Sequence, residues 1–233
     1  SWYRPAAIGL YSFQGLGLAV DPQNPSHVLV SMGGSYDNTR PYQGIYRSID
    51  GGESFGSRIL TGITDRRRGT HNSMAFAPGS GLVSGRTAKI FVIADGRSEA
   101  GNVNVPMARS TDGGATWTTL GSTWSQATRG LISFMVGDAS NDNRFYAATG
   151  SGFFRITNVF SGTFTVTELS GTGGLPTGEV DGPPYVSADG NTIIVGNPGT
   201  GIYKTTNGTA GTPTWSKVGT HTNFERLWVN PYD

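Results

Sequence analysis

The stretch Ser110-Thr111-Asp112-Gly113-Gly114-Ala115-Thr116-Trp117 decides the predicted fold, because Ser48-Ile49-Asp50-Gly51-Gly52-Glu53-Ser54-Phe55 nearly repeats it. In each copy the aspartate can accept hydrogen bonds from backbone N–H groups of a tight turn, and the glycines permit positive φ. Short apolar segments ending in arginine, Arg47 and Arg109, precede the two copies. Each copy is therefore predicted to be a turn between two strands, with the aromatic residue starting the second strand.

Two weaker copies extend the repeat. Residues 201–208, Gly-Ile-Tyr-Lys-Thr-Thr-Asn-Gly, carry Asn207 in place of the aspartate, and Trp215 supplies the aromatic ring. Residues 152–158 keep less of the pattern, with Phe164 as the aromatic residue. The residues assigned a structural role in these turns are Ser48, Asp50, Gly52, Phe55, Ser110, Asp112, Gly114, Trp117, Asn207 and Trp215.

A second recurring element, a strand ending near Asp or Pro, begins each repeat. Its equivalent positions, Asp21, Ala77, Gly137, Ala188 and Asn230, are separated by 56, 60, 51 and 42 residues. This period is near that of propeller blades. Four short strands can be assigned within each repeat, so the sequence predicts an all-β fold, a β-propeller of four-stranded antiparallel blades. The complete blades are placed at about residues 17–60, 73–120, 132–169 and 184–218.

The predicted blades do not close a ring. Residues 1–5 and 226–233 are assigned to single strands of incomplete blades. We therefore expect residues 1–233 to form one partial propeller domain, which a longer polypeptide or another chain completes.

The composition fits many short strands joined by turns and argues against several classes of partner. The chain has 233 residues, 36 glycines and 14% charged residues, with a net charge of +1. Nucleic acids and anionic membranes usually need a basic protein surface, so neither is expected as a partner. No segment approaches the roughly 18 apolar residues of a membrane helix. A β-protein rich in Gly, Ser and Thr with few lysines is typical of secreted, surface-exposed or virion-associated proteins.

The sequence offers no motif for a metal or a cofactor. It contains no cysteine, which excludes disulfides and cysteine-bound metals, and its three histidines are scattered. The glycine-rich pieces lack the lysine and helix of a phosphate-binding loop. We expect neither a metal nor a cofactor.

The repeated turn points to a candidate binding surface on the opposite edge of the blades. Because the turn joins the third strand of a blade to the fourth, the other long loops lie on the far edge. Aromatic rings there can stack on sugars while Asp and Arg bind hydroxyl groups, so a glycan or a protein is the expected partner. The candidate ligand-binding residues are Tyr36, Asp37, Arg40, Tyr42, Arg68, His71, Asp95, Arg97, Trp124 and Arg129.

The Ser-x-Asp-x-Gly-x-x-Trp pattern of residues 110–117, with its variant at 48–55, resembles the Asp-box or BNR repeat. Proteins with this repeat include sialidases, glycoside hydrolase family 74 enzymes, sortilin-type receptors and a photosystem assembly factor. The pattern of residues 20–30 and 44–52 looks most like family 74 and sortilin-like blades. The resemblance implies a propeller, and it covers about half of the chain.

The same resemblance leaves two functions open. Sialidases use an arginine triad, the first arginine lying in a Tyr-Arg-Ile-Pro strand; Tyr3-Arg4-Pro5 is similar but lacks the isoleucine, and the remaining partners have no counterpart. Family 74 enzymes use two aspartates from two propellers, so this chain could supply at most one. No catalytic residue is assigned. The preferred hypothesis is a binding or structural module without chemistry of its own, and the alternative is part of a xyloglucanase-like or sialidase-like glycoside hydrolase.

Overall fold

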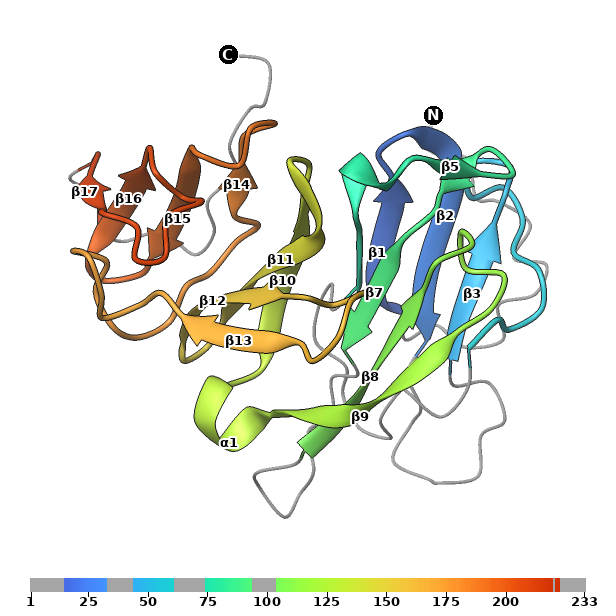
Figure 1. The fold of residues 1–233 in the computed structure, drawn as a ribbon, viewed down its shortest axis with the longest axis horizontal. Coiled ribbons are helices and arrows are strands. Elements are labelled where there is room, and N and C mark those ends of the chain that lie inside the picture. Colours follow the sequence, from blue (N-terminus) through green and yellow to red (C-terminus); the bar gives the residue numbers. More distant parts are fainter. Residues whose placement is uncertain (1–14, 33–43, 61–73, 94–103, 220, 223–233) are drawn as a thin grey trace. The chain divides into compact units, whose positions relative to one another are not determined.

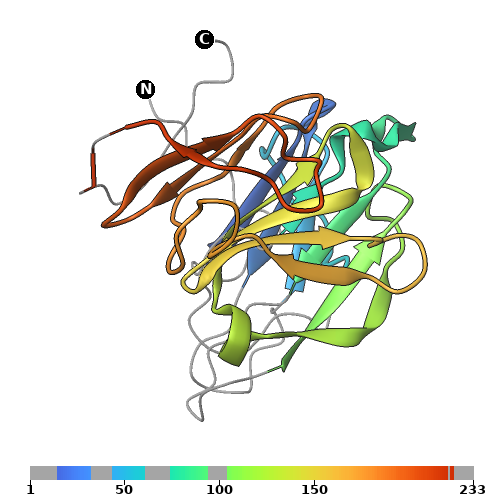
Figure 2. The same cartoon turned by 60° about the vertical axis from the view of Figure 1, so that its left-hand side comes forward.

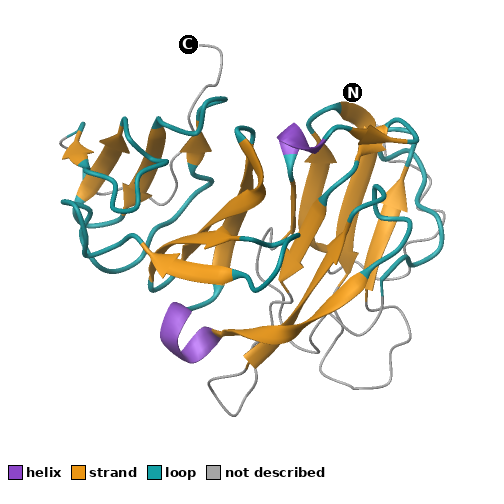
Figure 3. Cartoon of the chain, viewed as in Figure 1, coloured by secondary structure: helices purple, strands orange, loops and turns teal. Residues whose placement is uncertain are grey.

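The computed structural model of the chain describes residues 15–32, 44–60, 74–93, 104–219 and 221–222 (Figure 1). The chain divides into two compact units: unit 1 comprises Ser1–Phe76 and Ser80–Ala127, and unit 2 comprises Ala77–Gly79 and Thr128–Asp233. Antiparallel strands dominate both units, which confirms the predicted all-β class (Figure 3). The prediction that the chain forms a single domain stays a prediction.

Sheet 1, in unit 1, has three strands in the order β1 (Gly15–Asp21), β2 (Asn24–Met32) and β3 (Gly44–Ser48). The fourth strand predicted at residues 55–60 is wrong for most of its length, because only Leu60 forms a bridge, with Ile45. Backbone hydrogen bonds from Ile59 to Ile45 at 2.8 Å and from Gly56 to Arg47 at 3.0 Å still hold this segment beside β3. Gly56 weakens strand pairing, since it has no side chain to pack.

Sheet 2 completes unit 1 with the predicted four strands. Its order is β4 (Met74–Phe76), β7 (Ile90–Ile93), β8 (Asn104–Ser110) and β9 (Thr118–Ser125). A 3₁₀ turn, η1 (Pro78–Ser80), and a short hairpin of β5 (Leu82–Val83) and β6 (Arg86–Thr87) lie between β4 and β7. This hairpin was not predicted from the sequence. Ser84 and Gly85 form its tip with φ of 51° and 72°, the left-handed region that short hairpins require.

Unit 2 holds two further four-stranded sheets, and a short helix, α1 (Gln126–Arg129), straddles the boundary between the units. Sheet 3 runs β10 (Ile132–Asp138), β11 (Asn141–Thr149), β12 (Gly152–Thr157) and β13 (Thr165–Glu168). Sheet 4 runs β14 (Tyr185–Val186), β15 (Ile193–Asn197), β16 (Gly201–Thr205) and β17 (Ser216–Lys217). In both sheets, spatial order follows chain order.

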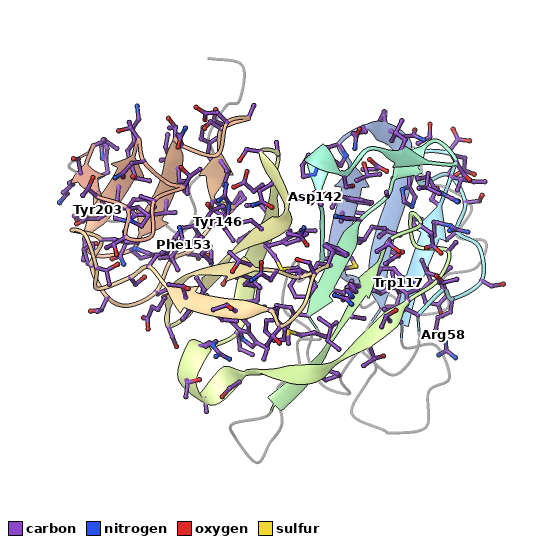
Figure 4. The ribbon with its side chains drawn as sticks, in the orientation of Figure 1. Arg58, Trp117, Asp142, Tyr146, Phe153 and Tyr203 are labelled. Carbon is purple, nitrogen blue, oxygen red and sulfur yellow. The ribbon has the colours of Figure 1, made fainter. Side chains whose placement is uncertain are left out.

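The core of unit 2 lies between one face of sheet 3 and one face of sheet 4 (Figure 2). The register pairs Ala148 with Phe153, so their side chains share a face of sheet 3. The Tyr146 and Phe153 rings stack with centroids 5.7 Å apart, and Trp215 meets Phe153 edge-on at 6.0 Å. Figure 4 shows Tyr146, Phe153 and Tyr203 in this core. Trp215 is 7% exposed, as predicted for an aromatic residue packed between sheets.

Candidate functional site

Most of the predicted ligand-binding surface lies outside the described residues, but the strands to which it attaches are described. Met32 at the end of β2 pairs with Gly44 at the start of β3, whereas Ser48 pairs with Val28 at the other end of the sheet. Segment 33–43 therefore joins sheet 1 at the edge opposite the Ser48 turn. The predicted residues that lie outside the described part are Tyr36, Asp37, Arg40, Tyr42, Arg68, His71, Asp95 and Arg97.

The prediction that Trp124 lies in an exposed loop is wrong. Strand β9 does not end at Leu120 but continues, after a register shift near Pro106, until Trp124 pairs with Val105. The indole is 1% exposed, because burying this large apolar ring is more favourable than leaving it in water. Trp124 therefore cannot stack on a ligand in this structure. Arg129 ends α1 and is half-buried, and its role in binding stays a prediction.

The corresponding loop edge of unit 2 includes a long connection, residues 170–184, that is described in full. Leu175 and Val180 are 1% and 0% exposed and belong to the core between sheets 3 and 4. The backbone N–H of Val180 donates to the carbonyl of Thr149 at 3.0 Å, at the end of β11. Glu179, between these anchors, is exposed. Two buried apolar residues thus fix this loop to the sheet edge while a carboxylate remains in solvent.

The opposite edge of sheet 1 carries the Ser48 turn, residues 48–55, which its own side chains close. Ser48 Oγ donates to Asp50 Oδ1 at 2.6 Å and accepts from the backbone N–H of Gly52 at 2.8 Å. The backbone N–H of Ser54 donates to Asp50 Oδ1 at 2.9 Å, and its hydroxyl donates to Oδ2 at 2.5 Å. The hydrogen bonds from Ser48 and Ser54 hold the pKa of Asp50 well below its usual range.

The Ser110 turn, residues 110–117, repeats this geometry in sheet 2. Ser110 Oγ donates to Asp112 Oδ1 at 2.8 Å and accepts from the backbone N–H of Gly114 at 2.9 Å. Thr116 donates from its backbone N–H to Asp112 Oδ1 at 2.8 Å and from its hydroxyl to Oδ2 at 2.5 Å. Burial opposes ionisation of Asp112, but the hydrogen bonds from Thr116 and Ser110 outweigh it, and the pKa of the carboxyl is lowered. Trp117 Nε1 donates to the carbonyl of Gly114 at 3.2 Å, and its ring is half-buried.

The Thr205 turn, residues 205–215, keeps the arrangement without a carboxylate. Thr205 Oγ1 donates to Asn207 Oδ1 at 2.7 Å, and the backbone N–H of Thr214 donates to the same oxygen at 2.9 Å. A neutral amide therefore performs the task of Asp50 and Asp112. Accepting hydrogen bonds requires only an oxygen atom, whereas general acid or base catalysis requires a group that exchanges a proton. The shared role of the three side chains is thus to close a turn.

Each turn is also tied to the neighbouring strand region of its own sheet. In each turn one backbone N–H donates to the carbonyl of a residue that lies near the start of the second strand of the same sheet or just before it. These bonds join Gly51 to Ser26 at 2.9 Å, Gly113 to Ala88 at 2.9 Å and Gly208 to Asn191 at 2.8 Å. The turns are therefore part of the sheets' hydrogen bonding as well as connections between strands.

Arg155, near the end of β12, binds the turn of the next sheet. Its Nη1 donates to the carbonyls of Gly208 at 3.3 Å and Ala210 at 2.6 Å, and its Nη2 donates to that of Gly211 at 2.7 Å. The side chain is on the same face of sheet 3 as Phe153, and Arg155 is 8% exposed. Sheet 3 thus holds the Thr205 turn of sheet 4 through three charge-assisted hydrogen bonds.

Arg47 occupies the equivalent position in sheet 1. Burial and the nearby Arg86 lower its pKa, while Asp112 in the turn of sheet 2 opposes the shift. Within the described part of the chain, Arg47 Nη1 and Arg86 Nε are buried without a hydrogen-bond partner. Arg47 therefore approaches the next turn, as Arg155 does, but interacts with its carboxylate through space.

A buried acid ends the first strand of sheet 1 and of sheet 3. Asp21 Oδ2 accepts from the backbone N–H of Thr87 at 2.8 Å and lies 2.8 Å from His27 Nδ1; all three residues are at most 1% exposed. Burial lowers the pKa of His27, and the hydrogen bond and charge of Asp21 oppose this shift. In sheet 3, Asp138 is 0% exposed and accepts from Arg144 Nε at 2.5 Å. Both acids are enclosed and bonded, which makes them structural residues.

The described ranges contain no group of three or more His, Cys, Asp or Glu side chains that could hold a metal ion. None of the helices among those residues is long and apolar enough to span a membrane.

Several solved structures are similar to this chain, and they include GH74 enzymes and a β-propeller domain. An ancestral GH74 enzyme aligns with a TM-score of 0.64 and 18% identity over 97% of this chain and 28% of its own. The GH74 enzyme of Niastella koreensis gives 0.56 and 22% over 88% and 24%, respectively. The β-propeller domain of Cps50 (Swd1) from Myceliophteria thermophila gives 0.56 and 6% over 94% and 60%.

At these identities the likeness establishes the fold alone, and the fold is that of a β-propeller. The chain spans about a quarter of the length of the two GH74 enzymes. No protein-family model matches the sequence, and no curated protein matches it.

Proposed function

We propose that this chain is an Asp-box propeller module that binds a glycan, or else a protein, through the loop edge opposite the three turns, without chemistry of its own. The observation that carries the proposal is the equivalence of Asp50, Asp112 and Asn207. Each closes its turn by accepting hydrogen bonds, and one of the three has no acid to offer. The turns that contain Asp50 and Asp112 resemble an acidic site in the sequence, but we assign these aspartates a structural role.

The loop edge is the remaining surface with the residue types that carbohydrate recognition uses. Segments 33–43 and 94–103 leave sheets 1 and 2 at this edge, because each begins where a second strand ends. Segment 33–43 carries Tyr36 and Tyr42 together with Asp37 and Arg40. Tyrosine rings provide flat apolar faces with a polar tip, and Asp and Arg provide hydrogen bonds to hydroxyl groups. An extracellular or surface-exposed location belongs to the same proposal.

The alternative is that the chain is part of a glycoside hydrolase, which its likeness to GH74 enzymes favours. Hydrolysis of a glycosidic bond requires two carboxyl groups roughly 5–10 Å apart on either side of the bond. Asp50 and Asp112 are bonded within their turns, and Asp21 and Asp138 are buried. A hydrolase would therefore need carboxylates from the loop edge or from another propeller.

A glycan array first ranks candidate ligands. Calorimetric titration with xyloglucan oligosaccharides then tests the proposal. We expect Tyr36→Ala combined with Tyr42→Ala to weaken binding by at least about tenfold, since a stacked aromatic ring contributes on the order of 1 kcal/mol. Ile49→Ala, at an exposed position in the Ser48 turn, serves as the control and should bind normally.

Two outcomes decide against the binding-module proposal. Unchanged affinity of the double tyrosine variant would show that segment 33–43 does not bind the glycan. Release of reducing ends from the oligosaccharides by the wild-type chain would favour the hydrolase alternative.

A further inference from the structure

Two partly buried arginines, Arg47 of β3 and Arg86 of β6, lie at the junction of sheets 1 and 2 in unit 1. The backbone N–H of Thr87 donates to Asp21 at 2.8 Å and so holds β6 beside sheet 1. Arg47 Nη1 and Arg86 Nε are buried, and within the described ranges no hydrogen bond or ion pair joins either guanidinium group to another residue. A buried charge is costly unless it is paired, so these groups require a neighbour of opposite charge.

The equivalent arginine of unit 2 has its hydrogen bonds satisfied. Arg155 donates to three carbonyls of the Thr205 turn, whereas Arg47 donates to none in the Ser110 turn. Arg86 lies over the Ser110 turn instead: a Cβ atom added to Gly113 would be 3.1 Å from Arg86 Nε. Gly113, at φ 68°, has no side chain to prevent this approach. Unit 1 therefore places a second cation beside the turn.

The carboxylate of the Ser110 turn does not balance these two charges. Burial lowers the pKa of Arg47 most, and repulsion from Arg86 lowers it further, by more than attraction to Asp112 raises it. The Asp112 oxygens already accept hydrogen bonds from Ser110 and Thr116. Two guanidinium groups thus share the influence of one carboxylate that other donors hold.

His27 contributes a third buried polar atom near the two arginines. Leu29 pairs with Arg47, so His27, two residues earlier in β2, is on the same face of sheet 1 as Arg47. His27 Nδ1 lies 2.8 Å from Asp21 Oδ2, while Nε2 is buried without a partner among the described residues. Burial lowers the pKa of His27, and Asp21 opposes this shift. Arg86 and Arg47 lower the same pKa further, so both guanidinium groups lie near the imidazole.

We propose that this junction is an anion-binding site in which Arg47 and Arg86 together hold one small oxyanion, such as sulfate or phosphate. Guanidinium N–H groups are strong donors to oxyanions, and an anion between two cations offsets their repulsion. When protonated, His27 Nε2 can donate to the same anion. The site lies beside the Ser110 turn, so it is independent of the loop edge proposed to bind a glycan.

Calorimetric titration of the wild-type chain with sulfate tests this proposal, with sodium chloride keeping the ionic strength constant. We expect one sulfate to bind per chain. Arg86→Gln and Arg47→Gln should each weaken binding by at least about tenfold, because each removes a charged donor to the anion. Arg58→Gln makes the same charge change at an exposed arginine of the same unit and is the matched control. Circular dichroism establishes that each variant keeps the fold.

The pKa of His27, followed by NMR of its imidazole carbons, distinguishes this junction from sulfate bound elsewhere. An anion beside the ring favours the protonated form, so sulfate should raise this pKa in the wild type and in Arg58→Gln. It should leave the His27 pKa of Arg86→Gln unchanged. A wild-type chain that binds no sulfate, equal affinities of Arg86→Gln and Arg58→Gln, or a wild-type His27 pKa that sulfate does not raise would each overturn the proposal.

Discussion

Arg155→Met is expected to lower the free energy of unfolding by about 2–4 kcal/mol, because it removes the hydrogen bonds that hold the Thr205 turn to sheet 3. Methionine keeps the apolar stem but donates nothing to the carbonyls of Gly208, Ala210 and Gly211. Hydrogen bonds from a charged donor contribute more than neutral ones, and the guanidinium is almost fully enclosed. Denaturant unfolding followed by circular dichroism measures the loss.

Two further variants bracket this prediction. Arg155→Lys should be intermediate, since an ammonium group cannot reproduce the fork of the guanidinium. Lys217→Met, an exposed cation on the neighbouring sheet, should change stability by less than about 0.5 kcal/mol. A loss for Arg155→Met no greater than that of Lys217→Met would show that the bridge to the turn contributes little.

Trp215→Ala is expected to be the most destabilising substitution in unit 2, at about 3–5 kcal/mol, because it empties a large volume between sheets 3 and 4. The ring is 7% exposed and packs edge-on against Phe153. Thermal unfolding monitored by tyrosine fluorescence and circular dichroism measures the effect.

Trp215→Phe separates packing from hydrogen bonding in this prediction. Among the described residues Trp215 Nε1 has no hydrogen-bond partner, so losing its N–H removes no such bond. The phenylalanine variant should therefore recover most of the lost stability. Trp117→Ala, at a half-buried ring, should cost clearly less than Trp215→Ala. Equal losses at the two tryptophans would contradict the difference in their packing.

The turns could be predicted from the sequence because their chemistry is local. Ser48, Asp50 and Gly52 lie within five residues of one another, and the pattern alone states which groups accept hydrogen bonds and where positive φ is needed. The same short-range pattern, repeated at a period near that of propeller blades, predicted blades of four strands. Sheets 2, 3 and 4 confirm that prediction.

Features that depend on packing between or across sheets could not be predicted in the same way. The burial of Trp124 follows from a register shift opposite Pro106, which no local signal marks. The three carbonyls that bind Arg155 come from a turn more than fifty residues later in the chain. Arg47 and Arg109 end the apolar segments before two of the turns, but no local pattern in the sequence assigns either side chain a partner.

The candidate loop edge was predicted from topology rather than from side-chain geometry. Strand register places the attachment of segment 33–43 at that edge. That the Tyr, Asp and Arg side chains of this edge bind a glycan is inferred from their chemistry, so glycan binding stays a prediction. Trp124 was misassigned because an aromatic residue among Gly, Ser and Thr suggests a loop, yet here it continues a strand.

The central claim is that Asp50 and Asp112 are scaffold, and an NMR titration of their carboxyl carbons tests it most directly. Because hydrogen bonds favour the ionised form in the folded state, both carboxyls stabilise the fold above the unfolded pKa, and this contribution is lost as pH falls through the folded pKa. We predict a pKa for each below the usual value of about 3.9. A pKa of either carboxyl raised to about 5 or higher, as in a general acid, would contradict the account.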